Sequence, residues 1–291
     1  MWRNLFIILF IFPAISFSQS AGDQLAVKNS MAFDKVSLNL TGTSGICLIK
    51  PAIHDDVLNV KKSAESPHIE ISLQHQIKDR INHIHFQLNK KSVNNMGKAL
   101  SHKIFNKSEE DDKWYVYLSR HKPYSLNLNY PVGDSYADLS GLPIETLKIN
   151  TGNADVKIGY FSSIYNPVEM DTFLAQVDFG SLHVAHLNMA KAKTIIADVG
   201  FGNLLLDFSD KCKNNSQIKV SVGAGKLTVN LPKHDTPVMV KLNDSPLCRV
   251  KIPEGFSQTA KNIFVNAAYL KNPQPHLTFD VDVALGNILF E

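Results

Sequence analysis

The chemical signature that stands out in the sequence is a pair of glycines followed by a lysine, Gly223-Ala224-Gly225-Lys226. Such loops bind phosphate groups when their backbone N–H groups and the ammonium group converge on the anion. A phosphate-binding loop requires Ser or Thr after the lysine, and a dinucleotide-binding turn requires a third glycine where a helix begins. Leu227 and Thr228 occupy these positions, and the chain continues with alternating apolar residues. The pattern therefore indicates a corner between two strands, and no nucleotide cofactor.

Two histidines, His83 and His85, could share a metal ion, because residues two apart lie on the same face of a strand. Protein zinc sites need at least three ligands, and no carboxylate or cysteine is placed as an obvious third one. His183 and His186 have opposite parity along a predicted strand, so they are weaker candidates. The sequence thus predicts solvated histidines at His83 and His85, with metal binding as the lesser hypothesis, and it predicts no cofactor.

Two other short motifs resemble catalytic or metal-binding loops only in part. The stretch Gly42-Thr43-Ser44-Gly45 lacks the final glycine of a hydrolase nucleophile turn, because Ile46 stands there. The acidic run at residues 108–112 lacks the glycine and the ligand spacing of a calcium loop. Neither motif predicts a catalytic residue.

The N-terminus has the composition of a secretory signal peptide. Arg3 precedes an apolar run from Leu5 to Phe12, and small residues follow at Ser16 and Ser18. We expect cleavage after Ser18, with Ser20 as the alternative, which leaves 291 − 18 = 273 residues and a flexible start at 19–33. No later stretch reaches the roughly 20 apolar residues of a membrane span. The expectation is export to the periplasm or to the cell surface.

Charge and cysteine content exclude several classes of partner and architecture. The formal net charge falls from +3 to +2 when Arg3 is lost, which is too small to predict a nucleic-acid partner. Cys47, Cys212 and Cys248 form an odd set without C-x-x-C spacing. One disulfide is possible among them, but three buried or half-buried thiols is the simpler expectation.

The pattern of strand, corner and strand recurs along the chain, which is the signature of a repeat protein. Around Val222, apolar residues lie two and four positions before it and five and seven positions after it. Seven copies fit this pattern, and the first six follow one another in steps of 19 to 26 residues. The predicted corner glycines are Gly133, Gly152, Gly180, Gly200, Gly202, Gly223, Gly225 and Gly286.

The change of parity at each corner predicts how a copy folds. Side chains alternate faces along a strand, so a continuous strand would turn its second apolar half outward. A bend at the glycines, which tolerate positive φ, returns that half to the inner face. One unit cannot bury this face alone, so we expect stacked coils that form an all-β parallel solenoid over residues 121–291. A sandwich of hairpins is the rival fold, but two-residue Asn-Gly or Asp-Gly turns are absent between the runs.

Residues 34–120 form the N-terminal part of the predicted structure. Residues 34–49 resemble one more copy, whereas the alternating runs within 66–120 predict wider first coils or an antiparallel cap. A solenoid needs such a cap, because its first coil would otherwise expose an unpaired edge. Two irregular insertions remain, 89–113 and 253–276, and the second is expected to lie over the last coils.

The residues YSLNLNYPVGDSYADLSGL, from Tyr124 to Leu142, together with IKVSVGAGKLTVNLP and LTFDVDVALGNILFE, resemble the bacterial toast-rack and adhesin-like domains. The resemblance covers roughly 34–291, and Asp138 to Leu142 and the Gly-x-Gly corners are its specific points. It implies an exported or membrane-tethered, right-handed β-helix-like domain, related to the end of cell-wall-antibiotic response proteins. It brings no catalytic residues with it.

These observations predict a non-enzymatic protein of the bacterial cell envelope that acts as an adhesin-like or scaffolding surface for a protein or a glycan. A glycan-cleaving β-helix enzyme is the alternative, and it would need converging carboxylates. Asp155, Asp178 and Asp207 occupy unlike positions in their copies, so no such pair is predicted. The last copy ends at Phe290 and Glu291, so we expect its edge to be covered by 253–276 or paired in a homo-oligomer.

Overall fold

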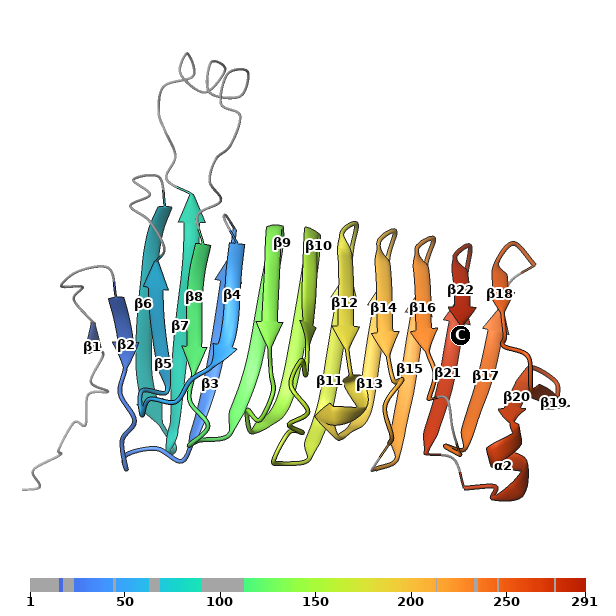
Figure 1. Ribbon diagram of the computed structural model, residues 1–291. Helices are drawn as coiled ribbons and strands as arrows, with labels where there is room; N and C mark the ends of the chain where they lie inside the picture. The colour runs from blue at the N-terminus through green and yellow to red at the C-terminus, as the bar shows by residue number, and fades with distance from the viewer. Residues whose placement is uncertain are drawn as a thin grey trace, which may run out of the picture.

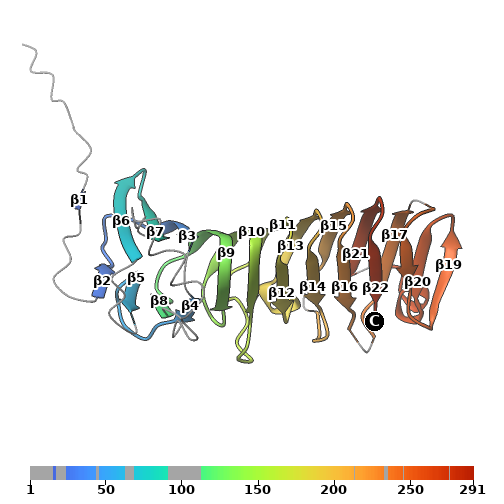
Figure 2. The same ribbon diagram turned by 90° about the horizontal axis from the view of Figure 1, so that it is seen from above.

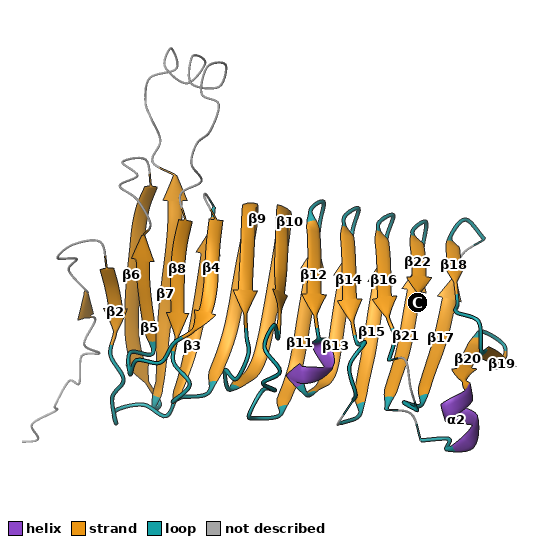
Figure 3. Cartoon of the chain, in the orientation of Figure 1, coloured by secondary structure: helices purple, strands orange, loops and turns teal. Residues whose placement is uncertain are grey.

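The computed structural model describes residues 16–17, 24–43, 46–62, 69–90, 113–212, 214–232, 235–244, 246–274 and 276–291. The predicted signal peptide lies outside this range except for β1 (Ser16–Phe17), which pairs antiparallel with β6 (Ile69–Lys78). The gap at 44–45 and the acidic run at 108–112 also lie outside it. The described chain is a long rack of parallel strands with very little helix (Figures 1 and 3). No helix in the described ranges has the length and apolar character that crossing a membrane would require.

Each coil contributes one strand to either of two parallel sheets, and Figure 2 shows the sheets as two rows that enclose the core. Two long strands, β9 and β10, bend through the corner and so serve both sheets. The coils are β9 (Tyr124–Asp138), β10 (Ile144–Gly159), β11 (Met170–Val177) with β12 (Ser181–Ala185), β13 (Ala192–Val199) with β14 (Asn203–Asp207), β15 (Ser216–Val222) with β16 (Lys226–Asn230), β21 (Leu277–Val283) with β22 (Asn287–Phe290), and β17 (Val238–Asp244) with β18 (Arg249–Lys251). The prediction of an all-β parallel solenoid is confirmed.

Strand pairing confirms the predicted steps in the middle of the repeat. Ile195 on β13 pairs with Phe173 on β11 and with Ile218 on β15, as steps of 22 and 23 residues require. The 61-residue step is also confirmed, because Val222 pairs with Val283.

The predicted register is wrong by two residues in the first copy and in β17. Tyr130, and not Val132, pairs with Thr151, and Val132 is exposed. Leu242 pairs with Val281, although the predicted partner was Val283. A shift of two residues keeps every side chain on its face, so an alternating sequence does not distinguish the two registers.

Both ends of the chain insert between coils formed by other parts of the sequence. The last two strands, β21 and β22, lie between the coil of β15 and β16 and the coil of β17 and β18. The expectation of a C-terminal edge that is covered by 253–276 or paired in a homo-oligomer is therefore wrong, because these strands have a parallel partner on either side. The C-terminal Glu291 N–H donates to Val229 O at 3.0 Å.

The N-terminal strands repeat this arrangement. The coil of β3 (Lys35–Gly42) and β4 (Ile46–Pro51) is inserted between β9 and the coil of β7 (Ile81–Lys90) and β8 (Lys113–Leu118). Beyond it, β6 pairs antiparallel with β7, and β5 (Leu58–Lys62) pairs antiparallel with β8 and with β2 (Gln24–Val27). The predicted antiparallel cap is thus confirmed, next to two wider parallel coils.

At the other end, the insertion that was expected to cover the last coils forms a small antiparallel extension. The strand β20 (Ile263–Asn266) pairs with β17 and with β19 (Phe256–Ala260), and α2 (Ala267–Lys271) follows it. Asn266 anchors this extension, since its Oδ1 accepts from Val238 N and Tyr269 N, both at 3.0 Å, and its Nδ2 donates to Thr236 O. The extension therefore covers the edge of β17.

The corner glycines serve close packing between coils more than left-handed backbone. Of the predicted corner glycines, Gly133 has a positive φ of 100°, whereas Gly225 does not have one. A Cβ atom on Gly225 would clash with the carbonyl oxygen of Gly202 and lie 2.7 Å from Val199 Cγ1. The expectation that positive φ explains all the corner glycines is wrong, because the coil spacing itself excludes a side chain there.

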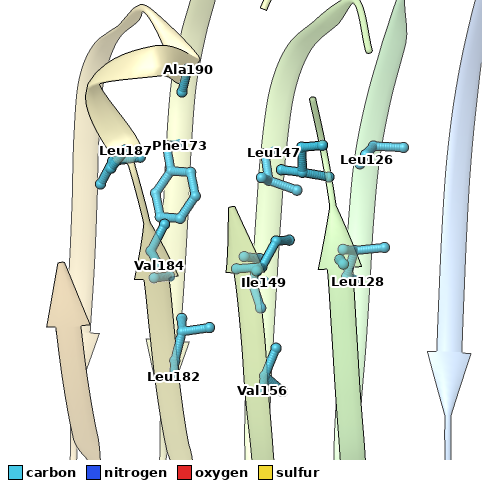
Figure 4. Close-up of a cluster of buried hydrophobic side chains, with 14 of the residues drawn as sticks. Leu126, Leu128, Leu147, Ile149, Val156, Phe173, Leu182, Val184, Leu187 and Ala190 are labelled. Carbon is cyan, nitrogen blue, oxygen red and sulfur yellow. The ribbon is translucent and has the colours of Figure 1, made fainter. Parts of the chain in front are cut away.

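The core lies between the two sheets and is built from ladders of apolar residues (Figure 4). Leu126, Leu147 and Phe173 follow one another on the first strands of three coils, and Val156 and Leu182 face them from the second strands. All five are at most 3% exposed. Because the apolar rows run through every coil, the outer faces of the sheets are held as rigid, regular surfaces.

Candidate binding surface

Aromatic and lysine side chains gather on the outer face of the sheet formed by β5, β8, β4, β9 and β10. Tyr115 on β8 lies opposite Leu48 on β4, which lies opposite Tyr136 on β9, which lies opposite Lys157 on β10. These residues alternate with the buried ones along their strands, so they face solvent. One flat face of the rack therefore carries a row that crosses four strands and that side-chain alternation keeps in place.

The rings on this face contact one another in two pairs. Tyr115 and Tyr117 stack with their centroids 6.3 Å apart and their planes at 14°. Tyr136 stacks on Phe161, which follows β10, at 4.7 Å and 21°. All four rings are half-buried. Ring pairs at these distances stabilise each other and leave a flat apolar surface toward solvent.

Three lysines lie beside these rings. The ammonium groups of Lys50 and Lys61 lie 5.5 Å and 5.9 Å from the ring centroids of Tyr115 and Tyr117, and Lys157 lies 5.5 Å from that of Phe161. Such contacts hold a cation over the negative face of a ring. Within the described ranges, no carboxylate lies within 4.0 Å of these three ammonium groups.

We call these seven residues the aromatic–lysine platform. Its members are Tyr115, Tyr117, Tyr136, Phe161, Lys50, Lys61 and Lys157. The pKa of Tyr136 is raised, mainly by burial and secondarily by the negative charge of Asp138, so this phenol stays protonated. Asp138 itself is engaged, because its Oδ1 accepts from the N–H and the hydroxyl of Ser140. The platform thus presents a protonated phenol and three ammonium groups.

The carboxylates of the same face lie one row nearer the corner. Asp134 and Asp155 are paired across β9 and β10, and Asp155 accepts a hydrogen bond from the hydroxyl of Ser181. Asp178 lies at the corner itself, and Asp207 ends β14. These aspartates do not form a row, in agreement with their unlike positions in the sequence repeat.

The two histidines of the candidate metal pair lie on the outer face of β7. His83 lies opposite Ser37 on β3 and Gln76 on β6, and His85 lies opposite Asn39 and Gln74. These neutral side chains are poor metal ligands beside imidazole. The described part of the chain contains no group of three His, Cys, Asp or Glu residues that could hold a metal ion.

A second cluster, unforeseen from the sequence, joins the turns that follow β12 and β14. His186 Nδ1 lies 2.5 Å from Asp210 Oδ2 and 3.9 Å from Asp207 Oδ2. Asp207 Oδ1 accepts from Ser209 N at 3.0 Å, so this carboxylate also shapes its own turn. His186 adopts a left-handed backbone, with φ of 53°, and caps the short 3-10 helix η1 (Leu187–Ala190). Sequence parity separated His183 from His186, but it gave no sign that Asp210 would meet His186 across coils.

A groove of about 450 Å³ opens beside this cluster. It is lined by Ser209, Asp210, Lys211, Cys212, Pro232, Asp235, Thr236 and His276. Burial, with a smaller contribution from Asp210, raises the pKa of the Cys212 thiol to about 12, so the group is not a thiolate nucleophile at neutral pH. Cys47, Cys212 and Cys248 are all free thiols, so no disulfide links them.

The platform was missed in the sequence because its parts come from distant strands. The run Lys113-Trp114-Tyr115-Val116-Tyr117 does alternate, which places both tyrosines outward. Their neighbours on β4 and β9 depend on the inserted N-terminal coil, and no local pattern predicts that pairing.

Comparison with known proteins was made with family models, curated proteins and solved structures. No curated protein matches the chain. Among solved structures, a "putative cell adhesion protein" from Clostridium sporogenes is 18% identical, with a TM-score of 0.42, and the match covers 96% of this chain and 99% of that one. A "putative adhesin" from Bacteroides fragilis is 12% identical, with a TM-score of 0.36 and coverage of 92% and 95%. The family model for the N-terminal domain of toast_rack, DUF2154, matches residues 17–171, more than half of the chain. The chain belongs to this toast-rack family.

Proposed function

We propose that this chain is an exported, non-enzymatic binding protein of the cell envelope that holds an acidic glycan on the aromatic–lysine platform. The observation that carries this proposal is the row of half-buried rings flanked by Lys50, Lys61 and Lys157 on a rigid sheet face. Export is supported by the residues between Arg3 and Ser18 that resemble a signal peptide.

The chemistry of the platform fits a sugar chain that carries carboxylate or phosphate groups. The apolar face of a pyranose ring can lie flat on an aromatic ring, as other planar ligands do on stacking platforms. Lysine ammonium groups attract anionic groups as mobile point charges without demanding one geometry. A flat, extended surface also suits a polymer better than a small molecule, which requires a concave pocket.

The proposal is tested by calorimetric titration of the purified chain with oligogalacturonate as the acidic probe and chitohexaose as the neutral probe. We expect binding of the acidic probe, weakened at least about tenfold, or 1.4 kcal/mol, in Tyr115→Ala/Tyr117→Ala and in Lys50→Gln/Lys61→Gln. Phe201→Ser, which changes an exposed residue far from the platform, is the matched control and should bind normally. Equal binding by all variants, or no binding of either probe, would overturn the proposal.

A glycan-cleaving activity is the second candidate, and one observation favours it. Asp207 and Asp210 lie beside a groove, with His186 between them. Glycoside hydrolysis requires two carboxyl groups across the scissile bond, one of which must be protonated. Here His186 and the backbone of Ser209 engage both carboxylates, which supports a structural role. Release of reducing ends from oligogalacturonate that is lost in Asp210→Asn would establish the enzyme instead.

A further inference from the structure

The corners of successive coils form one long edge of the rack, the upper edge in Figure 1. Phe179, Phe201, Ala224 and Leu285 each occupy the second position of a corner, and each donates its N–H to the coil before it. The residues at this position therefore lie in one row at the spacing of the coils, which is about 4.8 Å.

This edge is unusually apolar for a solvent-facing surface. Phe179 and Phe201 are 67% and 68% exposed, and their rings stack at 5.5 Å with planes 5° apart. Leu285 is 56% exposed in the same row. The corners of β9 and of β17–β18 add Val132 and Leu247, at 56% and 73%. We call these five residues the corner ridge.

Exposed apolar side chains need an explanation when they gather in one place, because large apolar patches on soluble proteins mark interaction sites. The core does not require them, since the residues at both sides of each corner are already buried. Val177 and Leu182, for example, flank Phe179 and are 1% exposed. A polar residue at the second corner position would fold equally well.

The backbone of the ridge can enter an apolar medium without leaving its N–H groups unpaired. Phe179 N donates to Gly152 O at 3.0 Å, Phe201 N to Asp178 O at 2.8 Å, and Leu285 N to Gly223 O at 2.8 Å. An unpaired backbone group would cost several kcal/mol in hydrocarbon. The pairing between coils removes this cost at the positions that project furthest.

Charged groups lie beside the ridge but not in its row. Asp178 precedes Phe179 in its corner, Asp134 and Asp155 lie on the adjoining sheet face, and Lys226 and Arg249 begin the second strands of their coils. Both signs are present, so the edge does not select an anionic or a cationic partner by charge. Its chemistry at the row itself is that of phenyl and aliphatic groups, which prefer the boundary between lipid headgroups and acyl chains.

We propose that the corner ridge rests in the surface of a lipid bilayer, with Phe179, Phe201 and Leu285 inserted between the headgroups. The ridge is convex, so a fluid lipid surface can take up its side chains, whereas a small ligand would need a concave site. The row is straight and held by the rigid sheets, so all its members can reach one plane together. The aromatic–lysine platform lies on the side of the rack and would remain open to solvent.

The test is flotation of the purified chain with vesicles of phosphatidylcholine alone. We expect a vesicle-bound fraction that persists in 0.5 M NaCl, because apolar insertion is not screened by salt. Phe179→Ser/Phe201→Ser should lower the bound fraction at least fivefold. The matched control is Ile196→Ser/Leu270→Ser, two exposed apolar residues outside the ridge, which should bind as the parent does.

A second measurement locates the contact. Phe201→Trp places a fluorophore on the ridge, and brominated phosphatidylcholine should quench it strongly, whereas a tryptophan at Leu270 should be quenched weakly. The proposal is overturned if the chain does not float with vesicles, or if both double variants float equally. It is also overturned if sedimentation shows a dimer that Phe179→Ser/Phe201→Ser dissociates while vesicles leave the parent unbound, because the ridge would then bind a second copy.

Discussion

Val222 and Val283 occupy the same register position in neighbouring coils, although 61 residues separate them in the sequence. The intervening segment continues as β17 and β18, which lie on the far side of the C-terminal coil. The strand that carries Val283 is therefore bordered by strands made both before and after the point where the chain turned back. The C-terminal residues hold two parts of the solenoid together.

A charge buried in this inserted coil should disturb both of its neighbours. Val281 is fully buried between β15 and β17, so Val281→Asp places an unpaired carboxylate in the core and should cost about 3 kcal/mol or more. Thr278→Asp, on the outer side of the same strand, should cost less than about 1 kcal/mol. Hydrogen exchange should show lost protection in β15 and in β17 alike. Lost protection in one of them alone would contradict the inserted arrangement.

The sequence predicted the repeat because alternation, corner glycines and apolar ladders are all local signals. It did not predict that both terminal coils are inserted, since the apolar rows of Leu38 and Phe279 look the same wherever the coil is placed. Register errors of two residues at Val132 and Leu242 have the same origin, because alternation repeats every two residues. The platform depends on this long-range order, so it could not be read from the runs that contain Tyr115 and Tyr136.

The two glycines of one corner should differ in their tolerance of a side chain. A Cβ at Gly225 would clash with the carbonyl oxygen of Gly202, whereas a Cβ at Gly223 would lie 3.0 Å from Gly200 O. Neither residue has a positive φ, so backbone strain does not confound the comparison. We expect Gly225→Ala to cost about 2 kcal/mol, in the range of overpacked sites, and Gly223→Ala to cost clearly less. Equal urea midpoints for the two variants would show that coil spacing does not select the glycine.

Three free thiols should be found in the exported, folded protein. Burial raises the pKa of both Cys47 and Cys212 to about 12, which keeps the thiolate fraction negligible at pH 8. We expect both residues to react with iodoacetamide far more slowly in the native state than in urea, and intact mass to show three alkylated residues after unfolding. A native species that takes up one alkyl group only, even in urea, would instead reveal a disulfide.

His183 should make the protein less stable as the pH falls through its ordinary titration range. Burial, with a smaller contribution from Lys157, lowers its pKa in the folded state, although Asp207 opposes this. The unfolded chain, with a histidine pKa near 6.5, therefore takes up the proton first, and stability is lost as the pH drops from about 7.5 to 5.5. His183→Gln should reduce this loss, measured as urea midpoints at the two pH values. An unchanged difference between them would assign the effect to other groups.

The most direct test of the proposed function is to locate the glycan on the folded chain. Lysine acetylation, read by mass spectrometry with and without saturating oligogalacturonate, reports on every accessible ammonium group at once. We predict protection of Lys50, Lys61 and Lys157 on the platform and unchanged modification of Lys219 and Lys241 on the opposite sheet. Protection spread evenly over all five lysines, or confined to Lys219 and Lys241, would contradict the binding of an acidic glycan on the aromatic–lysine platform.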